Sequence, residues 1–65
     1  MSDLAWCQFV ERVLETIETN RDKRAILAER IRHRDAYKLA YAERVAGADD
    51  ETVRRLIVQA AMNVT

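Results

Sequence analysis

A chain of 65 residues can form one small domain at most, and its single cysteine and single histidine exclude an intrachain disulfide and a Cys/His zinc site. Eleven basic and eleven acidic side chains give a formal net charge of zero, so no overall field attracts the chain to DNA or to an anionic membrane. A domain of this size buries only about 60% of the surface of its unfolded chain. Because disulfide and metal staples are excluded, we expect self-association or docking onto another protein to complete the fold.

The first predicted helix covers about residues 3–18. Ser2 or Asp3 can cap the free amides of its first turn. Apolar residues then recur at helical spacing and fall on one side, which predicts a buried face. The members of that face are Trp6, Cys7, Phe9, Val10, Val13, Leu14 and Ile17. Its place on this face predicts that Cys7 is a buried structural thiol.

Residues 19–22 can end one helix and start another. Thr19 and Asp22 approximate a capping box, and Asn20 tolerates the left-handed conformation that ends helices. We therefore predict a bend near residues 19–21, followed by a second helix over about 21–46. The alternative is one continuous helix over residues 3–46, because apolar and aromatic residues keep a coiled-coil spacing through this region.

The third predicted helix covers about residues 50–63. Gly47, the only glycine, can end the preceding helix, and Asp49 or Asp50 can cap the next one. No stretch shows the two-residue alternation of a strand, so the sequence predicts an all-α fold, a small helical hairpin or a three-helix domain. Val58 and Met62 lie opposite the apolar stripe of this helix, which indicates a second packing surface.

The sequence offers little support for catalysis. His33, Arg34 and Asp35 spell the start of a kinase catalytic loop, but the Asn that should follow and the glycine-rich loop are missing. Cys7 would need a nearby base to act as a nucleophile, and only His33 could supply one. We therefore expect a protein that is not an enzyme, with no catalytic residue, no metal site and no cofactor.

The basic segment 23–38 is a candidate for binding nucleic acid. Five cations could pair with phosphates and release counterions, and Tyr37 or Tyr41 could stack on an unpaired base. The competing interpretation is that these cations pair with acids of the first helix or lie solvated, which the zero net charge favours. The candidate cations are Lys23, Arg24, Arg30, Arg34 and Lys38.

Two segments, LAERIRHRDAYKLAYAE at residues 27–43 and DETVRR at residues 50–55, resemble small helical proteins encoded in bacteriophage genomes. Such proteins show an alanine-rich helix with an Ala-x-Tyr-Lys-like centre, a short loop and a Thr-Val start to another helix. The resemblance covers roughly residues 25–60 and matches no functional residue. It implies an accessory factor that binds and blocks a host protein, including components of bacterial defence.

We therefore predict a non-catalytic protein–protein interaction module, an inhibitor or adaptor of the phage type that acts on a bacterial protein and also self-associates. Apolar anchors would be desolvated at the centre of the contact, inside a ring of charges that sets specificity. The candidate partner-binding residues are Trp6, Phe9, Tyr37, Tyr41, Val58 and Met62. The alternatives are a nucleic-acid-binding accessory protein that uses segment 23–38 and a homo-oligomeric scaffold.

The sequence also suggests a location. Its start, Met-Ser-Asp, has an acid where a signal peptide carries basic residues. Its apolar runs are too short to span a bilayer, and a lone thiol is typical of a reducing compartment. We therefore expect a cytoplasmic protein.

Overall fold

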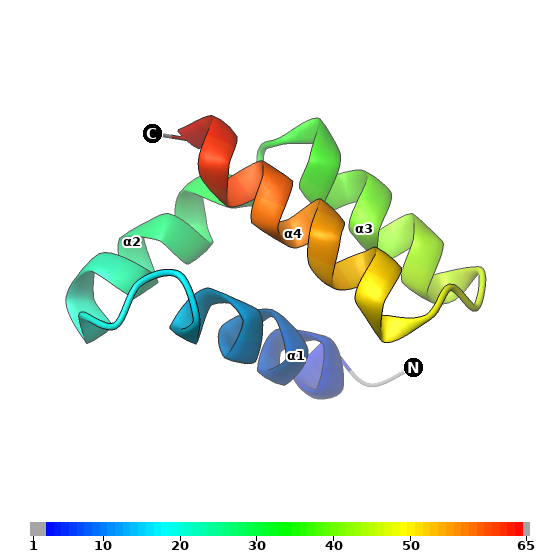
Figure 1. The fold of residues 1–65 in the computed structure, drawn as a ribbon, viewed down its shortest axis with the longest axis horizontal. Coiled ribbons are helices and arrows are strands. Elements are labelled where there is room, and N and C mark those ends of the chain that lie inside the picture. The colour runs from blue at the N-terminus through cyan, green and yellow to red at the C-terminus, as the bar shows by residue number, and fades with distance from the viewer. Residues whose placement is uncertain (1–2, 65) are drawn as a thin grey trace.

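The computed structural model describes residues 3–64, and within them the chain is all-α, as predicted (Figure 1). The four helices in this range are α1 (Asp3–Glu15), α2 (Arg21–Ile31), α3 (Asp35–Val45) and α4 (Asp50–Val64). α1 begins at Asp3, whereas Ser2, the other predicted cap, lies outside the described residues. The helix over 50–63 is confirmed as α4, but the predicted helices 3–18 and 21–46 both need correction.

α1 ends at Glu15, earlier than the predicted boundary at residue 18. The Thr16 hydroxyl donates to the Val13 carbonyl over 2.6 Å, and the amides of Thr16 and Ile17 bond to the carbonyls of Val13 and Leu14. These short-range bonds satisfy carbonyls that the end of the helix leaves open, and they tighten its last turn. The chain then leaves the helix, so the alternative of one continuous helix over 3–46 is wrong.

The bend predicted near residues 19–21 is confirmed, although a different residue forms the cap. Asn20, with extended backbone angles, accepts hydrogen bonds from the amides of Asp22 and Lys23 at 3.0 and 3.1 Å. Asn is among the preferred residues at this position because its short side chain reaches the second and third helical amides. Asn20 therefore caps α2 in place of the predicted pair of Thr19 and Asp22.

The predicted single helix over residues 21–46 is wrong, because the chain breaks between α2 and α3 at residues 32–34. No proline or glycine causes the break, and Arg34 starts α3 with extended backbone angles and no side-chain cap. The burial of Ile31 and Ala40 explains the break. On one straight helix they would point about 180° apart, yet both are fully buried in the same core. Breaking the helix turns both residues toward that core.

The connection between α3 and α4 follows the predicted chemistry. Gly47 adopts a φ of +97°, a left-handed conformation that L side chains rarely accept. The amides of Ala48 and Gly47 return to the carbonyls of Glu43 and Arg44, which is the Schellman motif. Asp49 then accepts the amide of Thr52 at 3.0 Å and caps α4. Both predicted features, the Gly47 end and the Asp49 cap, are confirmed.

The core lies between α4 and the other three helices. Figure 1 shows α4 across the middle of the molecule, antiparallel to α3, with α1 alongside and α2 crossing at one end. α4 contacts each of the other helices, and α3 most extensively. The largest fully buried side chains come from α1, α2 and α4 and are Leu14, Ile31, Val53 and Ile57. One contiguous apolar core therefore joins all four helices.

Two residues from the predicted buried face of the first helix are exposed. Cys7 is exposed, so the prediction of a buried thiol was wrong. It lies about 100° around α1 from the buried Trp6, at the edge of the packed face. Ile17 lies beyond the end of α1 and remains 41% exposed. Its side chain therefore belongs to the surface.

A matched pair of isoleucine substitutions tests the assignment of the core. Ile57→Ala removes a fully buried side chain of α4, so we expect the free energy of unfolding to fall by about 2–5 kcal/mol. Ile26→Ala makes the same chemical change at a side chain that is 54% exposed, and we expect a change within about 0.5 kcal/mol. Urea unfolding followed by circular dichroism measures both. Equal losses in the two variants would contradict the assignment.

Acidification tests the cap of α4. Hydrogen bonds from the side chain and the backbone amide of Thr52 hold the pKa of Asp49 below its usual value of 3.8. Because the folded state lowers this pKa, the cap stabilises the fold above pH 3.8, and that contribution is lost as the pH falls through the folded-state value. Asp49→Asn keeps an oxygen acceptor but cannot titrate. We therefore expect its melting temperature to fall less on acidification than that of the wild type.

The control for this experiment is Asp49→Ala, which lacks the acceptor and should lower the melting temperature at every pH. Part of the acid sensitivity should remain in Asp49→Asn, because hydrogen bonds from Arg54 and Arg55 also lower the pKa of Glu51. An acid-induced loss in Asp49→Asn as large as in the wild type would show that the Asp49 cap does not contribute.

Candidate functional site

An aromatic cluster joins α1 to α3, and Trp6 lies at its centre. The Trp6 Nε1–H donates to the Tyr37 hydroxyl over 2.8 Å. The rings of Phe9, Tyr37 and Tyr41 lie with their centroids 6.2, 5.8 and 5.2 Å from that of Trp6. Trp6 is only 7% exposed. The structure thus brings four of the six predicted partner-binding residues together, but it uses the indole to hold two helices of the same chain.

The partner-binding candidates other than Trp6 differ in exposure. Phe9 is half-buried, and the guanidinium of Arg44 lies 4.9 Å from the centroid of its ring. Val58 is half-buried and packs against the core, whereas Met62, also on α4, is 68% exposed. Of the six candidates, only Tyr41 and Met62 are exposed, and they lie on different helices. The predicted set is therefore divided between core and surface.

The basic candidates do not lie on one helix, as the predicted helix over residues 21–46 would have placed them. The Arg24 side chain is 15% exposed, and its Nε donates to Glu11 over 2.6 Å, while its Nη1 donates to the carbonyls of Glu18 and Thr19. Arg24 therefore fastens α2 to α1, as the competing interpretation expected. The exposed candidates are divided by the helix break, with Lys23 and Arg30 on α2 and Arg34 and Lys38 at the start of α3.

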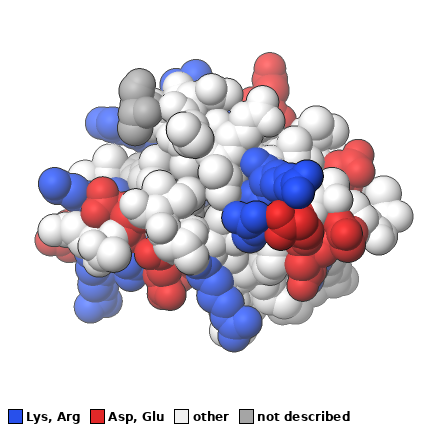
Figure 2. Space-filling model, viewed as in Figure 1, with Lys and Arg blue, Asp and Glu red and all other residues white. Residues whose placement is uncertain are grey.

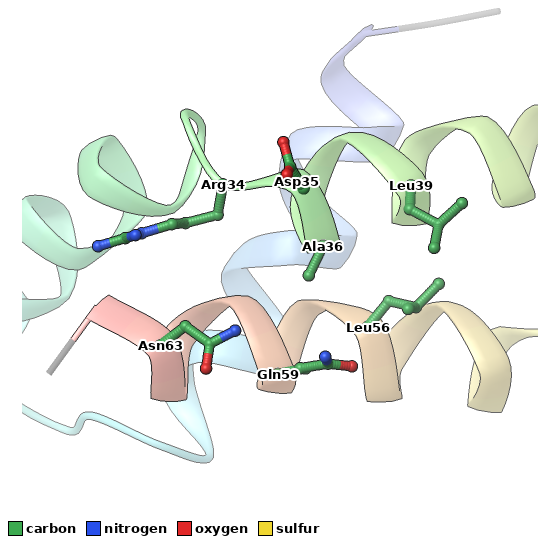
Figure 3. Close-up of a pocket in the computed structure, with 7 residues that line it drawn as sticks. All are labelled: Arg34, Asp35, Ala36, Leu39, Leu56, Gln59 and Asn63. Atoms are coloured by element: carbon green, nitrogen blue, oxygen red, sulfur yellow. The ribbon is translucent and has the colours of Figure 1, made fainter.

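Figure 3 shows a groove between α3 and α4, which we call the α3–α4 groove. Its lining residues are Arg34, Asp35, Ala36, Leu39, Leu56, Gln59 and Asn63. Leu39 and Leu56 approach each other from the two helices, while Gln59 and Asn63 lie along α4. The lining mixes leucines with amides and one charge of each sign. It therefore favours neither an acidic nor a basic partner.

A second groove is more apolar. We call it the α2–α4 groove, and its lining residues are Ile17, Glu18, Lys23, Ile26, Leu27, Arg30, Ala61 and Val64. Ile17 and Ile26 remain 41% and 54% exposed, and Ala61 is buried. Figure 2 shows largely uncharged surface where α2 meets the end of α4, with charged side chains toward the edges. This groove gathers aliphatic side chains from segments distant in sequence, and two of them, Ile17 and Ile26, are exposed.

Sequence reasoning missed the two exposed aliphatic residues of this groove. Ile17 was assigned to the buried face of a helix that in fact ends before it. The residues one turn before and one turn after Ile26 on α2 are all charged, so no apolar stripe marks it. The one available signal is the position of Ile26 between two cations on the same side of a helix. Lys23 lies one turn before it and Arg30 one turn after it.

The comparisons with known proteins add no relative. No family model, curated protein or solved structure matches the chain. Within residues 3–64, no three His, Cys, Asp or Glu side chains gather where they could hold a metal ion. None of the helices in this range has both the length and the apolar character needed to cross a bilayer. The grooves and their charges are therefore the observations from which a function can be argued.

A pair of tyrosine substitutions tests the role of the aromatic cluster. Tyr37→Phe removes the acceptor of the Trp6 N–H, so we expect the free energy of unfolding to fall by about 0.5–1.5 kcal/mol. Tyr41→Phe is the matched control, because its ring packs edge-on against Trp6 but its hydroxyl forms no hydrogen bond within the described range. We expect the control to change stability by less than about 0.5 kcal/mol. Chemical denaturation followed by tryptophan fluorescence measures both, and equal effects would contradict the assignment.

Proposed function

We propose that this protein is a non-catalytic protein-interaction module. The observation that carries the proposal is the α2–α4 groove, where two branched aliphatic side chains, Ile17 and Ile26, stay exposed beside Leu27 and Val64. Exposed aliphatic side chains scattered singly are normal, but a group of them inside a charged rim is typical of a binding surface. Covering these side chains with a partner would remove them from water, which stabilises a complex.

The resemblance to small helical phage proteins supports a particular form of this function. In that form the chain is an inhibitor or adaptor that acts on a bacterial protein. Self-association, which the sequence also predicts, has separate apolar residues to use, because Leu39 and Val45 on α3 are exposed and lie outside the α2–α4 groove. Binding to a partner and binding to a second copy can therefore use different faces.

The experiment that tests the function starts from affinity capture with the folded, immobilised chain in a bacterial lysate. The Ile57→Asp variant is the control, because a charge in the core disrupts the fold and leaves only nonspecific binding. Capture alone does not decide the question. The captured protein is then expressed and purified, and its binding to the purified chain is measured by titration calorimetry at two salt concentrations.

We expect a complex of fixed stoichiometry whose affinity falls by less than about tenfold between about 50 and 200 mM salt, because apolar contacts provide most of the binding and salt screens only the charges on the rim. Three results would contradict the proposal. These are a chain that binds only itself, a captured protein that does not bind once purified, and binding to nucleic acid that falls by about 10³-fold over the same salt range, as phosphate contacts predict.

A further inference from the structure

We propose that the α2–α4 groove is the docking site for an acidic amphipathic helix of a partner protein, an inference that rests on the proposed interaction function. The groove provides an apolar strip between two helices. Ile26 of α2 and Ile17 of the α1–α2 connection stand at its exposed sides, and Leu27, Ala61 and Val64 line it more deeply. A strip of this kind accepts apolar side chains that recur every three or four residues along a helix.

The charge on the groove rim determines which charge a partner should carry. Lys23 and Arg30 line the groove, and their side chains form no ion pair or hydrogen bond with any described residue. Most arginines elsewhere on the chain do pair with carboxylates, as Arg24, Arg44 and Arg54 show. The one acid in the lining, Glu18, already accepts the backbone amide of Asn20 over 3.0 Å. The rim therefore offers two unpaired cations, which complement an acidic partner.

The spacing of these cations favours a helical partner. Lys23 and Arg30 lie two turns apart on the same side of α2, about 10.5 Å along its axis. A helix laid along the groove can present carboxylates with the same two-turn repeat, while its apolar residues face Ile26. A peptide that binds by adding a strand would need a sheet edge, and residues 3–64 contain no strand; a polyproline segment would need aromatic side chains, which the groove lining lacks.

Two other occupants fit less well. A second copy related by a two-fold axis through the groove would place the cationic rim of one chain against that of the other, and like charges in a contact are costly. A nucleic acid would meet Lys23 and Arg30, but the groove between them is lined by aliphatic side chains and has no aromatic ring on which a base could stack.

The test selects partners from a display library of 15-residue helical peptides, with the folded full chain as the target. Enriched peptides should carry apolar residues at three- and four-residue spacing and an excess of Asp and Glu. The strongest peptide is then synthesised with a fluorescent label, and its affinity is measured by anisotropy. Ile26→Asp should weaken binding by about tenfold or more, whereas Leu39→Asp, an equally polar change on α3 outside the groove, should leave it within about twofold.

Charge reversal separates groove binding from any loss of folding. The exposed double variant Lys23→Glu/Arg30→Glu should melt near the wild-type temperature, reject the acidic peptide and bind its Lys-for-Glu counterpart. Several results would overturn the inference. These are no enriched peptide, a basic consensus, binding unaffected by either groove variant, or a wild-type dimer that Ile26→Asp dissociates. A purified partner complex that tolerates both groove variants would refute this inference while leaving the proposed function intact.

Discussion

The fold depends on burial of the apolar side of α4 against three other helices. Val53 and Ile57 of α4 are fully buried, and the core to which they belong includes side chains from all four helices. Burying a large aliphatic side chain contributes roughly 1.5–3 kcal/mol. A chain this short has few such residues, so each of the other helices must present its own to α4.

This requirement explains the helix break at residues 32–34. Ile31 and Ala40 would lie on opposite sides of one straight helix, and α4 can cover only one side. Backbone propensity favours continuing the helix, because no proline or glycine interrupts it. Tertiary burial outweighs that local preference and turns α3 back along α4. The same arrangement leaves one side of α2 uncovered, and that side carries Ile26 between Lys23 and Arg30.

Local chemistry made part of this structure predictable from the sequence. Gly47 and Asp49 act through the backbone within a few residues, so the end of α3 and the start of α4 could be assigned correctly. The break at Arg34 could not, because that residue forms no side-chain cap and its position is set by burial at Ile31 and Ala40.

The candidate site was less predictable than the fold. Arg24 is one of several similar cations in the sequence, and only the packing of α2 against α1 places Glu11 within 2.6 Å of it. Trp6 is a residue type that often anchors a protein interface. In this fold α3 packs beside it, provides Tyr37 as its hydrogen-bond partner and helps to bury its side chain. The α2–α4 groove combines residues from α2, the end of α4 and the connection before α2. No pattern within a short stretch of the sequence indicates that these residues come together.

The claim that one core forces the second predicted helix to break is tested most directly by backbone ¹³Cα chemical shifts of the folded protein. The account predicts helical shifts over residues 21–31 and 35–45, with an extended-type shift at Arg34 between them. Uninterrupted helical shifts from residue 21 to residue 45 would contradict it, because Ile31 and Ala40 could not then share one core.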